Sequence, residues 1–140
     1  MFRISSQIIN CTLLLFVAST AFAAEDYPVK PISIVVAYAP GGQGDTFARL
    51  VGEKLTTALK QSVVVDNKPG VSGTIGTRLV AKAKNDGYTL LLGQTGEIVV
   101  NRLLIKDMGY DTIKELIPVV LIGNAPLIML APADAPYNTV

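Results

Sequence analysis

A glycine-rich loop near the start of the chain carries residue types that suit an anion-binding site. Residues 32–38 form an apolar run rich in β-branched side chains, the sequence Pro40-Gly-Gly-Gln-Gly-Asp45 follows, and a helical pattern begins at once. Such a strand–loop–helix unit places backbone N–H groups and the positive end of a helix dipole at the carboxyl end of a strand. The alternative is a tight turn without a ligand, in which Asp45 is an N-cap or first-turn residue of the helix.

Two later loops occupy the same place relative to a strand. Residues 63–65 and 88–92 have the apolar character of short strands, and each is followed by a glycine-containing loop and then by a helical pattern. This alternation predicts an α/β domain with a parallel sheet. Because the carboxyl ends of parallel strands share one edge, we expect the loops at 40–45, 69–73 and 94–97 to gather there.

The first helical pattern covers residues 45–59 and predicts the face that packs on the sheet. Its large apolar residues recur at three- and four-residue spacing, which is typical of a helix with one buried stripe. These residues are Phe47, Leu50, Val51, Leu55, Ala58 and Leu59. Further helices are expected around residues 75–83 and 97–104.

The composition argues against an enzyme. The chain has no histidine, and its only cysteine, Cys11, lies in the apolar N-terminal stretch, so the commonest general base and thiolate chemistry are missing. The three serines beyond residue 23 have no histidine to activate them, which excludes a Ser-His-Asp hydrolase. Of the 12 basic residues only Arg3 precedes residue 24, so 11 remain against 11 acidic residues, without a charge run that would attract nucleic acid.

The first 23 residues have the pattern of a cleaved export signal. Arg3 precedes an apolar core at residues 11–17, and Ala21-Phe-Ala23 fits a small-x-small cleavage site. A membrane anchor is the alternative, but a bilayer span takes about 20 consecutive apolar residues. Cys11 lies at the start of the apolar core rather than after it, which does not fit a lipoprotein signal. We expect residues 1–23 to be a signal peptide.

The glycine-rich loop does not match the known nucleotide-binding loops. Asp66 ends the next strand roughly where a ribose-binding acid would stand, but Phe47 occupies the position at which a dinucleotide fingerprint needs a small residue. A phosphate-binding P-loop would need Gly-Lys-Ser/Thr, which is missing. We therefore expect neither a nucleotide nor any other cofactor.

The alternation of strands and helices stops after Tyr110. We expect residues 111–116 to form one or two helical turns capped by Asp111, and residues 119–122 and 127–130 to form strands. Two apolar runs with a brief interruption are typical of a chain that leaves one sheet and enters another.

An ordered series of motifs runs from residue 27 to the end of the chain: Tyr27-Pro-x-Lys-Pro-Ile32, Pro40-Gly-Gly-x-x-Asp45, Val64-Val-x-Asn67-Lys-Pro-Gly70, Gly73-x-x-Gly76, Ala81-x-Ala83, Asp86-Gly-Tyr-Thr-Leu90, Gly93-x-Thr-Gly96, Asn101 and Tyr110-Asp111. This series resembles the periplasmic solute-binding receptors of tripartite tricarboxylate transporters, also called the Bug or tricarboxylate receptor family. The order of the motifs makes the resemblance far more specific than any one of them.

The resemblance implies a parallel-sheet, three-layer α/β domain of a type II periplasmic-binding-protein (Venus-flytrap) fold. Such a receptor closes on a small organic acid and delivers it to the membrane permease subunits of its transporter. The protein is then a periplasmic monomer that binds without catalysis, a cofactor or a metal. Residues 24–118 would be the first domain, and residues 119–140 the crossover toward a second.

The family's ligand loops follow the strands of the first domain and hold a ligand carboxylate through backbone donors and bridging waters. Carried over by position, the resemblance implies these ligand-binding residues: Ala39, Pro40, Gly41, Gly42, Gln43, Gly44, Asp45, Gly73, Thr74, Gln94, Thr95, Gly96, Glu97 and Asn101.

Two departures from the family pattern bear on function. Family members are more than twice as long, so we expect a truncated form that binds ligand weakly or not at all by itself; a fragment without function and a small exported α/β enzyme are the alternatives. Glu97 also stands where the family often has a small or neutral side chain. Near an anionic ligand it costs energy unless it turns away or the ligand carries a cation, so we hypothesise a zwitterionic or amide-bearing ligand. If this loop is not a binding site, Glu97 and Arg102 are expected to be solvated residues of a short helix.

Overall fold

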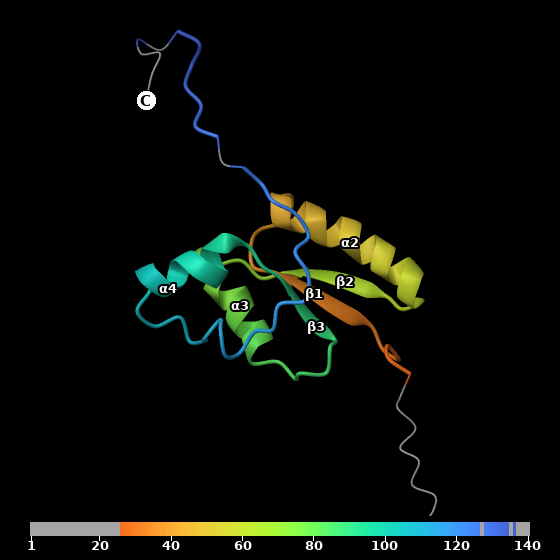
Figure 1. Cartoon of the computed structure of the whole chain (residues 1–140). Coiled ribbons are helices and arrows are strands. Elements are labelled where there is room, and N and C mark those ends of the chain that lie inside the picture. Colours follow the sequence, from red (N-terminus) through yellow and green to blue (C-terminus); the bar gives the residue numbers. More distant parts are fainter. Residues whose placement is uncertain (1–25, 127, 135, 137–140) are drawn as a thin grey trace, which may run out of the picture.

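A parallel three-stranded sheet forms the centre of the computed structural model, which describes residues 26–126, 128–134 and 136. Strand β1 (Ile32–Val36) lies between β2 (Val63–Asn67) and β3 (Thr89–Leu92), as Figure 1 shows. Ile34 is in register with Val65 on one side and with Leu90 on the other. The predicted parallel sheet is confirmed, and the predicted signal peptide lies outside the described residues.

The central strand is buried on both faces because its sequence is almost continuously apolar. Ile34 and Val36 form a buried cluster with Ala48 and Leu92 on one face. Val35, which points to the opposite face, is only 1% exposed. A strand covered on both sides is what a parallel α/β sheet requires.

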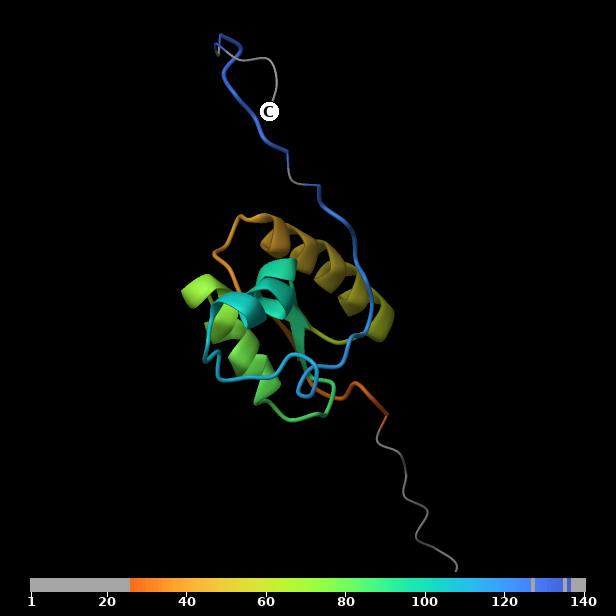
Figure 2. The same ribbon diagram turned by 60° about the vertical axis from the view of Figure 1, so that its left-hand side comes forward.

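Helices cover both faces of the sheet and complete three layers. Figures 1 and 2 show α2 (Gln43–Leu59) on one side, and α3 (Thr74–Ala81) with α4 (Asn101–Leu104) on the other. The turn η1 (Val71–Gly73) leads into α3, and the π-helical turn η2 (Gly96–Val100) leads into α4. The helices predicted around residues 45–59, 75–83 and 97–104 are therefore present, although α3 ends two residues earlier than the pattern indicated.

The buried face of α2 differs from the predicted apolar stripe. Its buried residues are small or polar, namely Gly44, Asp45, Ala48 and Gly52. Val51, Leu55 and Leu59 are half-buried, whereas Phe47, Leu50 and Ala58 are exposed. A Cβ atom on Gly52 would lie 3.4 Å from Val63 Cγ1, so small residues let α2 approach the valine-rich strand closely. Apolar spacing alone marks large residues and misses this contact face.

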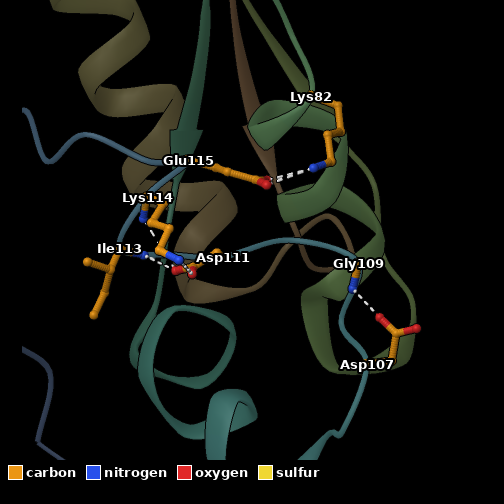
Figure 3. Close-up of polar contacts among 7 residues, drawn as sticks. All are labelled: Lys82, Asp107, Gly109, Asp111, Ile113, Lys114 and Glu115. Carbon is orange, nitrogen blue, oxygen red and sulfur yellow. Dashed lines mark hydrogen bonds and ion pairs between the residues drawn. The ribbon is translucent and has the colours of Figure 1, made fainter.

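The expected helix at residues 111–116 is a hydrogen-bonded turn instead. Asp111 Oδ1 accepts hydrogen bonds from the N–H groups of Ile113 (2.9 Å) and Lys114 (3.3 Å), as an N-capping residue would. The turn is held against the end of α3 by an ion pair between Lys82 and Glu115, at 2.8 Å, whose side chains point toward each other in Figure 3. The predicted role of Asp111 as a cap is thus confirmed for a turn, not for a helix.

The expected strand at residues 119–122 is absent. Val119 is 82% exposed and Leu121 is 76% exposed, and this segment pairs with no strand in the described part of the chain. A strand needs a neighbour for its backbone groups, which an apolar pattern by itself does not supply. The expected strand at residues 127–130 is likewise not formed over 128–130, and Leu127 lies outside the described residues.

Candidate functional site

The three predicted loops gather at the carboxyl edge of the sheet. Hydrogen bonds between side chains and backbone tie the segments after the strands to one another. Asn67 Nδ2 donates to the Tyr38 carbonyl at 3.1 Å, the Tyr38 hydroxyl donates to Glu97 Oε2 at 2.7 Å, and Asn101 Nδ2 donates to the Ser72 carbonyl at 2.8 Å. The predicted convergence is therefore confirmed.

The first loop ends at a helix N-terminus that no side chain caps. Gly42 is the N-cap residue, and the first hydrogen bond of the α-helical repeat runs from the Thr46 N–H to the Gly42 carbonyl at 3.0 Å. The N–H groups of Gln43 and Gly44 in the first turn therefore have no partner within the helix. Gly41 has φ +83°, which favours glycine there. The loop thus offers backbone donors and a helix dipole to an anion.

Asp45 shapes this loop from within. Its Oδ2 accepts hydrogen bonds from the Gly41 N–H and from Arg49 Nε, each at 3.0 Å. Its Oδ1 lies 3.0 Å from Arg49 Nη2 in an ion pair that lacks the alignment of a hydrogen bond. The Arg49 hydrogen bond, then the Gly41 N–H, lower the pKa of the Asp45 carboxyl to about 2. Asp45 is a first-turn residue whose charge is already paired.

The second loop approaches the other two through a glycine. Gly73 has φ +85°, and a Cβ atom there would lie 3.1 Å from Glu97 Cβ and 3.2 Å from the Tyr38 hydroxyl oxygen. Its carbonyl accepts a hydrogen bond from Thr77 Oγ1 at 2.9 Å, inside α3. Thr74, the first residue of α3, is buried. A side chain at position 73 would push the loops apart.

The third loop contains a fully buried carboxylate. Glu97 has 0% exposure, so the expectation of a solvated residue is wrong, whereas Arg102 is exposed as expected. Glu97 Oε1 accepts from the Gln94 N–H at 2.6 Å, its Oε2 accepts from Tyr38, and its own carbonyl accepts from the Tyr110 hydroxyl at 2.8 Å. The side chain turns away from solvent because Gln94 and Tyr38 donate to its two oxygens inside the domain.

The candidate residues divide into an accessible group and a supporting group. The first comprises the exposed residues Ala39, Pro40, Gly41, Gly42, Gln43 and Thr95, with Gln94 and Gly96 half-buried. The second comprises the buried residues Gly44, Asp45, Gly73, Thr74, Glu97 and Asn101. The geometry brings all of these segments together, and their contact with a ligand stays a prediction.

Two supporting residues were not predicted from the sequence. Asn67 fixes the Tyr38 carbonyl, and Tyr110 fixes the Glu97 carbonyl. Asn67 was detectable as a polar residue at the end of an apolar strand on the same edge. Tyr110 lies 13 residues from its partner in an irregular segment, and its spacing gave no signal.

A shallow hollow of about 420 Å³ is lined by residues from the end of α3 to the turn after Asp111, including Lys82, Arg102 and Glu115, and none of its lining residues belongs to the three loops. In the described part of the chain, no group of three or more histidine, cysteine, aspartate or glutamate residues is placed to hold a metal ion. Nor does this part contain a helix long and apolar enough to cross a membrane.

This architecture is that of a domain of a periplasmic binding protein. The structure of the periplasmic binding protein BugD is similar with a TM-score of 0.59 and 43% identity, over 61% of this chain and 28% of that one. The structure of R. palustris Rpa4515 with adipate is similar with a TM-score of 0.61 and 41% identity, over 63% of this chain and 29% of that one. The structure of MatC from Rhodopseudomonas palustris with bound malate is similar with a TM-score of 0.61 and 34% identity, over 64% of this chain and 30% of that one.

The model of the tripartite tricarboxylate transporter family receptor matches residues 47–140, and the chain belongs to this family. A UPF0065 protein of Bordetella bronchiseptica is 39% identical over 98% of the chain, and the protein BugT of Bordetella pertussis is 37% identical over 83%. The chain spans 41% and 37% of the lengths of these relatives. The family and the structural neighbours are solute-binding receptors, not enzymes, which confirms the expectation drawn from composition.

Proposed function

We propose that this chain is the first-domain portion of an exported solute-binding protein that captures a small organic carboxylate for a tripartite tricarboxylate-type transporter. The observation that carries the proposal is the gathering of three loops, one of them at the uncapped start of a 17-residue helix, on one edge of a parallel sheet. Structural neighbours with adipate and with malate support a carboxylate as the ligand.

The chemistry left free at the edge suits a carboxylate. Asp45 is paired with Arg49, and the Glu97 oxygens accept hydrogen bonds from Tyr38 and Gln94. The N–H groups of Gln43 and Gly44, in the uncapped first turn of α2, have no partner within the helix. Aligned amides and a helix N-terminus bind anions without a cationic side chain. The first turn of α2 would hold one carboxylate, and the N–H groups of Thr95 and Gly96 would add donors. The N–H groups of Gly73 and Thr74 donate to the Gly70 and Val71 carbonyls, so the second loop would support the site without adding a backbone donor.

The place of action follows from the family and the N-terminal pattern. The structural neighbour BugD is a periplasmic binding protein. The pattern of residues 1–23 supports export of this chain to the same compartment by a cleaved signal peptide. Its partners would be the ligand and the permease subunits of the transporter, and the chain would act as a monomer.

Two other functions are less well supported. A small exported enzyme lacks histidine and cysteine chemistry beyond residue 23, and the neighbours are receptors. A fragment without function would bind no carboxylate at all. A melting experiment separates this fragment from the proposed receptor.

The purified chain should be melted with malate or adipate at up to about 100 mM, against the neutral diamide adipamide and matched salt. One set of loops supplies part of a receptor's contacts, so we expect a Kd of several millimolar and a stabilisation of roughly 2 kcal/mol at the highest concentration. The acids should raise Tm by several degrees over the diamide. Equal melting curves with acids and diamide would contradict the proposal.

A further inference from the structure

Glu97 differs from the other buried carboxylate of the loop edge because no cation neutralises it. Asp45 pairs with Arg49 at 3.0 Å, whereas no lysine or arginine of the described chain forms an ion pair with Glu97. Its two oxygens accept from neutral donors, the Gln94 N–H at 2.6 Å and the Tyr38 hydroxyl at 2.7 Å. Accepting at both oxygens is the pattern of an ionised carboxylate. A fixed negative charge therefore lies inside the domain.

Glu97 lies next to the segments that follow all three strands. Tyr38 follows β1 and Gln94 follows β3, and each forms a hydrogen bond with the Glu97 carboxylate. A Cβ atom on Gly73, in the loop after β2, would lie 3.1 Å from Glu97 Cβ. Glu97 therefore contacts the segments that follow all three strands, and an anion held at this edge would feel its charge, since the Debye length at physiological ionic strength is about 8 Å. A buried charge at that range is only partly screened.

We propose that Glu97 is a specificity-determining residue, whose buried negative charge lowers the affinity of the loop edge for ligands that bring a second negative charge to it. This inference rests on the proposed function. Glu97 is 0% exposed, so it acts through its field and not by contact. The favoured ligand class is a carboxylate whose second polar group is neutral or cationic, because repulsion of the second charge is then absent.

Succinate and succinamate provide the test, because they have nearly the same shape and differ by one charge. Loop amide shifts in NMR titrations of the purified chain give both Kd values. We expect succinamate to bind roughly three- to tenfold more tightly than succinate. In Glu97→Gln the ratio should fall to about one, since the amide keeps an oxygen for Gln94 and an NH2 group for the Tyr38 hydroxyl. Glu53→Gln, an exposed position on α2, removes the same charge and should leave the ratio unchanged.

The outcomes distinguish this inference from the proposed function. If neither ligand shifts a loop amide of the unmodified chain, the proposed function fails and this inference fails with it. If both ligands bind but the ratio is equal in the unmodified chain and in Glu97→Gln, the specificity role alone is overturned, even where affinity falls for both. Should Glu97→Gln not fold, the unmodified chain decides alone, and succinate binding as tightly as succinamate overturns the inference.

Discussion

At the scale of single residues, two buried carboxylates organise the loop edge in different ways. Asp45 holds the first loop by accepting from the Gly41 N–H and from Arg49. Glu97 joins the other segments through Tyr38 and Gln94. Both carboxylates are engaged inside the domain, Asp45 by Gly41 and an ion pair with Arg49, and Glu97 by neutral donors. The N–H groups of Gln43 and Gly44 in the first turn of α2 have no partner within the helix. These roles predict distinct responses to pH.

Asp45 should contribute stability that disappears in acid. Its pKa is lowered to about 2 from 3.8, so its contribution is fully present above about pH 4 and is lost as pH falls toward 2. Urea unfolding from pH 5 to pH 2 should show a smaller loss in Asp45→Asn than in the unmodified chain. Glu53→Gln, on the same helix but exposed, is the control. Parallel losses in all three proteins would argue against this role.

In the folded protein, the Tyr38 hydroxyl should stay protonated to a higher pH than an ordinary tyrosine hydroxyl does. Burial, and then the hydrogen bond to Glu97, raise the pKa of the Tyr38 hydroxyl from 10.0. The folded state thus favours the neutral phenol, and this stability is present below pH 10 and lost as pH rises further. When tyrosine ionisation is followed by absorbance, the Tyr38→Phe variant should lack one of the hydroxyl groups that ionise at high pH in the unmodified chain. At pH 7 the lost hydrogen bond to a charged acceptor should cost about 1.5–3 kcal/mol, measured by urea unfolding. An unchanged high-pH fraction would contradict the assignment.

At the scale of elements, small residues set how closely the helices approach the sheet. Gly44, Ala48 and Gly52 form the contact face of α2. On the other side, a Cβ atom on Gly76 of α3 would lie 2.9 Å from both Ala37 Cα and the Lys68 carbonyl oxygen. Close packing of α3 places its N-cap Gly73 and its first residue Thr74 at the loop edge.

The two helix glycines should respond oppositely to a methyl group. Gly76→Ala drives a Cβ atom into backbone atoms, so we expect a loss of about 1–3 kcal/mol despite the higher helix propensity of alanine. Gly52→Ala meets only side-chain atoms, at 3.4 Å and beyond, so it should be neutral or stabilise by up to about 1 kcal/mol. Denaturant unfolding compares the pair. A Gly76→Ala variant as stable as Gly52→Ala would refute this packing argument.

The sequence predicted these elements because their signals are local. The apolar run of β1 and the glycine loops before α2, α3 and η2 fix the α/β alternation and the shared edge. The pairing of Glu97 with Tyr38 was beyond prediction, since the two residues are 59 positions apart and only the folded sheet brings them together. The strand predicted at 119–122 is absent for the opposite reason. Its apolar pattern is local, but a strand also depends on a neighbouring strand, which the pattern does not reveal.

At the scale of the whole molecule, the described chain gathers three loops on one edge of a parallel sheet. β1, the most buried strand, leads into the first loop, and β2 and β3 lead into the other two. Relatives are longer, and the chain spans 41% of the first of them. The central claim is that the shared edge binds a carboxylate through backbone N–H groups, without a cationic side chain.

An NMR titration of the purified chain with malate tests this claim most directly, because it locates the bound anion among the backbone amides. We expect shifts confined to the amides of residues 41–45, 73–74 and 94–96, saturating in the millimolar range. The amides around Asp86, at the opposite end of the sheet, provide an internal control. Shifts confined to the three loops would support the claim. Shifts centred on lysine or arginine clusters elsewhere, or no shifts at about 100 mM malate, would contradict it.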